Sequence, residues 1–322
     1  GICGTDLHEF LDGPIFIPPA GAPHPLTGDT LPVVIGHEFA GGVTEIGVGV
    51  GSVGVGDRVA VEPFYVCGTC SACTAGRYNV CRQVGFVGLA SQTGGFAEFA
   101  VVDERWAHPL GDIATDIGAL VEPLAVGYHA VRISTLPPGG TAVVFGAGPI
   151  GLVTASVLRA IGAGQVIVVE PAAARKVKAA GLGADHVLDP TELDVPATVR
   201  ELTKGAGADV AFECAGVDAA LAAAIGSVSP GGTVVNVAIW GHQPPVQMND
   251  LVLSEVTVIG SLAYCEDHPA TIGLLCDRKV DAEPFITGRI ALQDIVEGGF
   301  RQLIDNKEEN VKILVTPRGH DR

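Results

Sequence analysis

The sequence predicts an α/β protein that combines a β-rich part with a doubly wound parallel sheet. Between residues 30 and 110 it contains short strand-like segments separated by glycine turns, which is typical of a small β-barrel or sandwich. From about 141 to 265, apolar strands alternate with helical segments, as in parallel sheets built from βαβ crossovers. A Pro-Pro-Gly-Gly break at 137–140 separates the two patterns.

Length and composition exclude several classes of protein. The 322 residues are enough for two domains. Although 48% of the residues are hydrophobic, no uncharged apolar run reaches about 18 residues, so we expect no membrane span. The formal charge of −17 argues against a nucleic-acid partner, because phosphate backbones require clustered Lys and Arg. No secretory signal is visible, which predicts a cytoplasmic location.

Strands are expected before and after the alternating part. In the β-rich part they are GGVTEIG, GDRVAVEP and GGFAEFAVVDE, and the Gly/Val run at 47–56 connects the first two as a hairpin. Near the end of the chain, strands in RIALQD and VKILVTP flank a helix near 294–306 and return to the first domain. The predicted division is 1–123, 124–265 and 266–322.

The alternating part begins with a strand at 141–146, a helix at 148–163 and a strand at 165–170. The turn after the first strand carries Gly146, Gly148 and Gly151 in G-x-G-x-x-G spacing. The first glycine permits the turn, the second lets the backbone approach a pyrophosphate, and the third allows close strand–helix packing. A Rossmann-type dinucleotide site is therefore predicted.

Four further residues complete the predicted cofactor site. Pro149 and Ile150 begin the helix whose free N–H groups would face the phosphates. Glu170, at the end of the second strand, is placed to accept hydrogen bonds from the adenosine ribose and would repel a 2′-phosphate. NAD is therefore predicted over NADP. Arg175, the one nearby signal for NADP, lies five residues further on and is alternatively a neighbour of the adenine.

A four-cysteine motif lies within a lobe at about 62–85. Four clustered thiolates suit tetrahedral Zn²⁺ and leave no open coordination position, which predicts a structural zinc. The C-x2-C-x2-C-x3-C-P and C-x4-C-x2-C spacings of iron–sulfur proteins do not match. The motif consists of Cys67, Cys70, Cys73 and Cys81.

A second set of possible metal ligands is scattered along the chain: Cys3, His37, Glu38 and Glu122. Taken singly, each has an ordinary structural explanation, since a lone buried cysteine usually packs as a small apolar residue. From the residues alone, a catalytic zinc and separate structural roles remain about equally open.

Seven motifs follow one another between residues 1 and 151: GICGTD, GHEFAG, GDRVAVEP, the four-cysteine lobe, GGFAEF, LVEPLAVGYHAV and GAGPIG. In this order they resemble the zinc-containing medium-chain dehydrogenase/reductase superfamily of alcohol dehydrogenases. More narrowly, DLHEFLDGPIFIP, GFVGL, FECAG and IGSLAYCEDH resemble (R,R)-2,3-butanediol dehydrogenases, with sorbitol-type polyol dehydrogenases as neighbours. The resemblance implies a GroES-like β-barrel catalytic domain beside the Rossmann domain.

The resemblance also implies the site. Cys3 and His37 would bind a catalytic zinc, with Glu122 as third ligand and Glu38 as an alternative ligand or a carboxylate beside the metal. Asp6 would orient the histidine, as carboxylates beside metal-bound imidazoles do.

Thr5 is implied to accept the substrate hydroxyl proton, and His8 to pass it to solvent. The implied reaction is hydride transfer between NAD(H) and a secondary alcohol or ketone, most closely (R,R)-2,3-butanediol and acetoin. The alternatives are a polyol or L-threonine dehydrogenase and, in another class, a non-catalytic NAD-binding protein. Relatives form homodimers or homotetramers and carry a few tens of residues before GICGTD, so we expect a homo-oligomer and an N-terminally truncated sequence.

Overall fold

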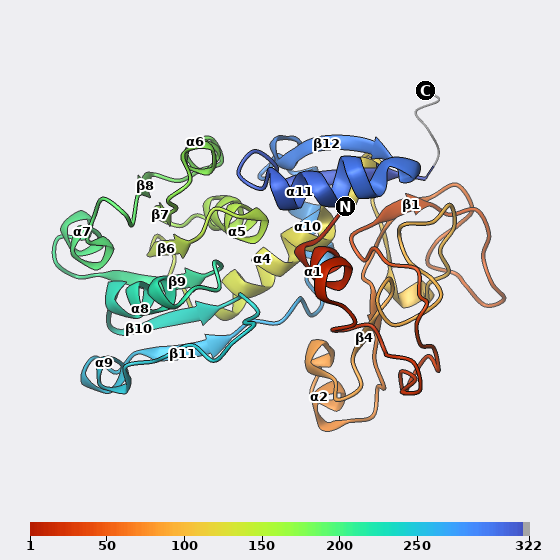
Figure 1. Ribbon diagram of the computed structural model, residues 1–322, viewed down its shortest axis with the longest axis horizontal. Coiled ribbons are helices and arrows are strands. Elements are labelled where there is room, and N and C mark those ends of the chain that lie inside the picture. The colour runs from red at the N-terminus through yellow and green to blue at the C-terminus, as the bar shows by residue number, and fades with distance from the viewer. Residues whose placement is uncertain (318–322) are drawn as a thin grey trace. The chain divides into compact units, whose positions relative to one another are not determined.

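The chain folds into two units in the computed structural model, which describes residues 1–317 (Figure 1). One unit contains Gly1–Glu122 together with the chain from Cys265 onward, and the other contains Pro123–Tyr264. Each unit is described separately below.

The unit formed by Pro123–Tyr264 is built on a six-stranded sheet in the order β11-β10-β9-β6-β7-β8. All of its pairings are parallel, which confirms the doubly wound sheet predicted from the sequence. The order reverses between β6 and β9, the position at which such sheets bind ligands. The strands are β6 (Thr141–Phe145), β7 (Gln165–Val169), β8 (His186–Leu188), β9 (Ala208–Glu213), β10 (Val228–Asn236) and β11 (Thr257–Gly260).

Helices cover both faces of this sheet. Val143 and Phe145 of β6 belong to a buried cluster with residues of α7 and α8, whereas a Cβ on Gly151 of α5 would lie 3.5 Å from Val144. Because neighbouring strand residues point to opposite faces, α5 packs on the face opposite α7 and α8. The helices are α4 (Val121–Ile133, which begins at the boundary), α5 (Pro149–Ala160), α6 (Ala173–Gly181), α7 (Val195–Leu202), α8 (Asp218–Ser227) and α9 (Met248–Leu253).

The other unit contains short strands. β1 (Ala40–Gly42), β2 (Arg58–Val61) and β5 (Ala107–Pro109) form an antiparallel sheet, and the β1–β2 pairing confirms the hairpin predicted around 47–56. β3 (Phe64–Tyr65) pairs with β4 (Gly85–Phe86). β12 (Ile286–Ala291) and β13 (Lys312–Thr316) pair in parallel, where two strands were predicted.

The strand predicted at 94–104 is wrong. Only Gly95 and Phe96 donate backbone hydrogen bonds to a neighbouring segment, to Gly36 and Ile35. Beyond them the segment turns outward, and Val101 is 79% exposed. The alternating residues therefore lie in a bent, partly exposed segment that pairs with no strand.

Helical segments of this unit are mostly short. The helix predicted near 294–306 is present, but as a succession of 3₁₀, π and α turns. No helix within residues 1–317 combines the length and apolarity needed to cross a membrane. The α-helices are α1 (Gly4–Asp12), α2 (Ser71–Thr74), α3 (Thr115–Gly118), α10 (His268–Cys276) and α11 (Arg301–Asp305); the others are η1 (Tyr78–Val80), η2 (Glu104–Trp106), η3 (Glu283–Phe285), η4 (Leu292–Asp294) and η5 (Ile295–Phe300).

Candidate active site

The N-terminus of α1 carries Cys3 and Asp6, and Asp6 in turn faces His37. Cys3 is the N-cap residue, and its backbone N–H donates to Asp6 Oδ2 at 2.9 Å. The other carboxylate oxygen of Asp6 lies 3.4 Å from His37 Nδ1, and Asp6 is fully buried. With Nδ1 directed at the carboxylate, Nε2 is the nitrogen of His37 left for a metal.

Cys3, His37 and Glu38 converge, because their ligand atoms all lie within 4.8 Å of one another. Burial opposes a charge on the His37 ring, yet Asp6 and Cys3 raise the pKa of His37 well above its usual value. Negative groups that favour a proton at this point also favour a divalent cation. Thiolate, imidazole and carboxylate are the donor types of catalytic zinc sites, so the residues present fit the metal.

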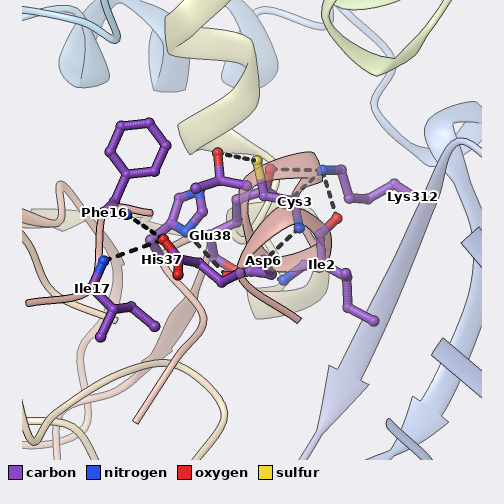
Figure 2. Close-up of polar contacts among 11 residues, drawn as sticks. Ile2, Cys3, Asp6, Phe16, Ile17, His37, Glu38 and Lys312 are labelled. Carbon is purple, nitrogen blue, oxygen red and sulfur yellow. Dashed lines mark hydrogen bonds and ion pairs between the residues drawn. The ribbon is translucent and has the colours of Figure 1, made fainter. Parts of the chain in front are cut away.

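Glu38 is held by a lysine that sequence reasoning missed. Lys312 Nζ in β13 lies 2.6 Å from each oxygen of Glu38 and donates to the carbonyl of Ile2 at 3.0 Å (Figure 2). Both side chains are buried. Burial alone would lower the pKa of Lys312, but Glu38 and Cys3 raise it, so the amine stays charged. The sequence did contain a signal for a buried charge here, because Lys312 lies inside the otherwise apolar segment VKILV.

Glu122, the other carboxylate predicted at the metal, is buried at the start of α4. Its charge also contributes to raising the pKa of Lys312. Glu122 is not among the donors that lie within 4.8 Å of Cys3 and His37, whereas Glu38 is. The Lys312 contact, however, occupies both oxygens of Glu38.

Thr5 and His8 both lie on α1, two and five residues after the cysteine. Thr5 Oγ1 is 3.8 Å from Cys3 Sγ. Residues three apart share one face of a helix, so the His8 side chain leaves α1 on the same side as Thr5. Thr5 is half-buried and His8 is exposed, which suits groups that exchange protons with a substrate and with solvent, respectively.

The four cysteines of the lobe are gathered as the sequence predicted. Their sulfur atoms are separated by 3.4 Å (Cys67 and Cys81), 3.6 Å (Cys70 and Cys73) and 4.0 Å (Cys67 and Cys73; Cys70 and Cys81). Four sulfurs at zinc–sulfur bonds of about 2.3 Å lie about 3.8 Å apart in a tetrahedron. The lobe therefore has the dimensions of a tetrahedral tetrathiolate site.

Backbone groups already favour thiolates in this lobe. The N–H groups of Thr69 and Cys70 lower the pKa of Cys67 to about 6. Burial and the neighbouring thiols raise the pKa of Cys73 to about 12. Zinc binding must therefore displace the Cys73 proton, since the ligand is the thiolate.

In the other unit, the three motif glycines have the three environments that the sequence predicted for them. Gly146 has φ of +93°, a conformation that favours glycine. A Cβ on Gly151 would lie 1.8 Å from the carbonyl oxygen of Gly146, whereas a Cβ on Gly148 would meet nothing within 4 Å. The space beside Gly148, at the N-terminus of α5, is therefore open to a ligand, and helix N-termini favour anionic groups such as phosphates.

Pro149 and Ile150 form the first turn of α5, as predicted. Glu170 is buried directly after β7, where its carboxylate accepts hydrogen bonds from the N–H groups of Ala147, at 2.7 Å, and Ala172, at 2.9 Å. A carboxylate has further lone pairs for ribose hydroxyls. Arg175 is half-buried in the first turn of α6.

Comparison with known proteins identifies the family. Residues 1–112 match the alcohol dehydrogenase GroES-like domain, and residues 149–276 match the zinc-binding dehydrogenase domain. The chain therefore belongs to the zinc-binding alcohol dehydrogenase family, which confirms the resemblance and the predicted fold class.

Among its relatives, the (R,R)-butanediol dehydrogenase of Neisseria gonorrhoeae is 47% identical over 98% of this chain and 90% of that protein. The crystal structure of 2R,3R-butanediol dehydrogenase from Bacillus subtilis superposes with a TM-score of 0.93 at 46% identity, covering 99% of this chain and 90% of that one. A zinc-binding dehydrogenase from Sinorhizobium meliloti 1021, bound to NADP, has a TM-score of 0.84 at 30% identity, with 98% and 89% coverage.

Proposed function

We propose that this protein is a zinc- and NAD-dependent secondary-alcohol dehydrogenase that interconverts (R,R)-2,3-butanediol and acetoin. The observation that carries the proposal is the convergence of Cys3 and His37, whose ligand atoms lie within 4.8 Å of each other, with Asp6 behind the histidine. The substrate follows from the butanediol dehydrogenases to which almost the whole chain is similar.

Two zinc ions belong to the proposal. Cys3 and His37 hold the catalytic ion, with Glu122 as the third protein ligand, and the four cysteines of the lobe hold the structural ion. Glu38 is proposed to lie beside the metal, with ligation as the alternative, because the charge of Lys312 offsets that of its carboxylate. When bound by these residues, zinc would lower the pKa of an alcohol hydroxyl, and a nicotinamide would supply the hydride acceptor.

The residues of α1 move the proton. Thr5 accepts it from the substrate hydroxyl, and His8 takes it onward to solvent, since an imidazole exchanges protons near neutral pH. Asp6 keeps the His37 ring oriented. The butanediol thereby loses one proton through these residues and one hydride to the cofactor, which leaves acetoin.

The cofactor is proposed to be NAD, although the relative from Sinorhizobium meliloti binds NADP. Glu170 supports this choice, because a buried carboxylate beside the nucleotide loop repels a 2′-phosphate. The loop and the N-terminus of α5 bind the pyrophosphate, and Arg175 flanks the adenine.

A substrate panel tests the reaction. The purified protein is assayed with four substrates, each with NAD and with NADP: (R,R)-2,3-butanediol, meso-butanediol, sorbitol and L-threonine. We expect the highest kcat/KM for (R,R)-butanediol with NAD. Cys3→Ser and His37→Ala should abolish turnover and leave NADH binding, measured by fluorescence, unchanged. Sorbitol or threonine as the best substrate would replace the substrate assignment, and equal loss of turnover and NADH binding would contradict the division of roles.

Glu170→Ala tests the cofactor assignment. Removal of the carboxylate should raise the KM for NAD and reduce the discrimination against NADP, because the ribose contact and the repulsion disappear together. The ratio of kcat/KM values for the two cofactors is the measurement. Glu192→Ala, at an exposed position beyond β8, is the control. An unchanged ratio in Glu170→Ala would refute the ribose role.

We also propose a homodimer or homotetramer assembled through the nucleotide-binding unit. Edge strand β11 and helix α9 expose large apolar side chains, among them Leu253 at 83% and Val252 at 67%. Apolar patches of this kind mark association surfaces. Light scattering of the purified protein gives the mass, and a monomer would contradict this part of the proposal.

A further inference from the structure

A third group of metal-ligating side chains occurs in the unit that contains α1, outside the two sets assigned above. Glu62 directly follows β2, His108 lies in the adjacent strand β5, and His268 is the first residue of α10. The β2–β5 pairing sets Ala60 opposite His108. The chain thus brings together three residues that lie far apart in sequence.

The ligand atoms of this group are close to one another. Glu62 Oε2 lies 2.8 Å from His108 Nε2 and 3.8 Å from His268 Nδ1, and one ligand atom from each residue falls within 4.8 Å of the others. The two imidazole rings stack with centroids 5.1 Å apart and planes 25° apart. Nitrogen and oxygen donors of a tetrahedral zinc ion, at bonds of about 2.0–2.1 Å, lie about 3.4 Å apart. The two distances from Glu62 Oε2, 2.8 Å to His108 and 3.8 Å to His268, fall on either side of this value.

Tyr78 fixes the orientation of the carboxylate. Its hydroxyl donates to Glu62 Oε1 at 2.5 Å, which leaves Oε2 directed at the two histidines. Burial and the charge of Glu62 raise the pKa of Tyr78, so the hydroxyl remains a donor. Outer hydrogen bonds of this kind orient the carboxylate ligands of metal sites.

The charge of the group suits a cation. Glu62 is 1% exposed and His268 is fully buried. Burial and the nearby His108 lower the pKa of His268 well below its usual value, so its ring is neutral, the form in which an imidazole binds a metal. The His108 side chain is 17% exposed, which leaves a route from solvent.

We propose that Glu62, His108 and His268 bind a divalent transition-metal ion, Zn²⁺ being the probe, at a site separate from the catalytic and four-cysteine sites. Two imidazoles and one carboxylate are a ligand set that zinc accepts in proteins, with a fourth position left for water.

The proposed site would help to hold the chain from Cys265 onward against the first part of its unit. Just before His268, the Glu266 N–H donates to Tyr78 at 2.6 Å and the Cys265 thiol donates to the carbonyl of Gly76 at 3.0 Å. Gly76 and Tyr78 belong to the four-cysteine lobe. A metal ion would therefore tie the start of α10 to β2, β5 and this lobe.

Zinc content tests the proposal. The full-length protein is purified without chelators, dialysed against metal-free buffer, and analysed by plasma mass spectrometry with His268→Asn and the matched control His186→Asn, a half-buried histidine in β8. We expect His268→Asn to lose one zinc per chain relative to the native protein, and His186→Asn to lose none. Equal zinc content in the native protein and a folded His268→Asn would overturn the proposal.

Anomalous scattering of native crystals at the zinc edge provides a readout that does not depend on a variant's folding. A peak within bonding distance, about 2.1 Å, of Glu62 Oε2 and both imidazoles supports the site. An absent peak, or one that appears only after soaking in millimolar Zn²⁺, overturns it.

Discussion

At the scale of single residues, Lys312 and Glu38 form a buried ion pair at the candidate active site. Their side chains are 4% and 1% exposed, and the amine contacts both carboxylate oxygens. The mutual attraction of such a pair offsets the loss of hydration only while both partners are present. Lys312 therefore fixes both the charge and the direction of Glu38 beside Cys3 and His37.

Lys312→Met should destabilise the protein strongly, because it leaves a buried carboxylate without its cation. Removing one partner of a buried ion pair typically costs about 3–5 kcal/mol. Urea unfolding measures the change. Lys279→Met is the matched control, since the Lys279–Asp277 pair is exposed and such pairs contribute at most about 1 kcal/mol. Adding Glu38→Gln should recover part of the loss; a single-variant cost as small as that of the control would contradict the assignment.

Replacing Gly148 or Gly151 by alanine should have different effects: the first should weaken NADH binding and the second should lower stability. Gly148→Ala adds a methyl group to open space at an ordinary φ of −72°, so the melting temperature should not change. The methyl group would stand where the pyrophosphate binds, and we expect NADH affinity to fall by about tenfold or more, equivalent to about 1.4 kcal/mol.

Gly151→Ala places the methyl group 1.8 Å from the oxygen of Gly146 and should destabilise the unit itself, by about 1–3 kcal/mol or more. Thermal unfolding and NADH fluorescence titration, applied to both variants, separate the two roles. A loss of stability in Gly148→Ala, or a stable Gly151→Ala, would show that the glycines are wrongly assigned.

At the scale of elements, α1 carries most of the site chemistry near its N-terminus. Its N-cap residue Cys3 is a candidate ligand, and Asp6 accepts the Cys3 N–H while facing His37. Thr5 and His8 share a face of the same helix. These residues were recognisable in the sequence but the helix was not predicted, although an acidic residue three positions after an N-cap is a capping signal.

The end of β8 is held to α6 by a charged contact. Asp189 accepts hydrogen bonds from Lys176 at 2.5 Å and from the hydroxyl and backbone N–H of Thr191. These donors lower the pKa of Asp189 to about 2. A carboxyl group with a depressed pKa stabilises the folded state above its ordinary pKa of about 4, and that stabilisation is lost as the pH falls towards 2.

Asp189→Asn should therefore reduce the acid sensitivity of folding. The urea midpoint of the native protein should fall more steeply between about pH 4 and 2 than that of the variant, because only the native carboxylate takes up a proton there. Asp305→Asn, an exposed position on α11, is the control. Parallel pH profiles for the native protein and Asp189→Asn would refute this role of the Lys176 contact.

Two elements show where sequence patterns mislead. The alternating residues at 94–104 predicted a strand, but only two backbone hydrogen bonds join that segment to a neighbour. The helix near 294–306 was predicted correctly, but its middle part, Ile295–Phe300, is a π-helix. Strand pairing and helix type depend on neighbouring segments, which local periodicity does not specify.

At the scale of the whole molecule, the two units differ in how far their sequences predicted them. The parallel sheet is built from consecutive βαβ steps, so each strand follows its helix in the sequence and the pattern is local. The other unit joins Gly1–Glu122 to the chain beyond Cys265, and its buried contacts join its two ends. Lys312 with Ile2 is an example.

The sequence by itself determined the class of fold, the cofactor loop, the four-cysteine lobe and the resemblance to zinc-containing dehydrogenases, because each depends on local residue patterns and on motifs that can be recognised along the chain. Only the tertiary structure decided that Lys312 engages Glu38 and that Glu62, His108 and His268 converge. These contacts join residues up to 274 positions apart, and no local pattern specifies which distant segments meet in the folded unit. The start of α1, GICGTDLHEF, shows both: its motif was recognisable from the sequence, but its partners His37 and Glu38 are brought to it by the fold.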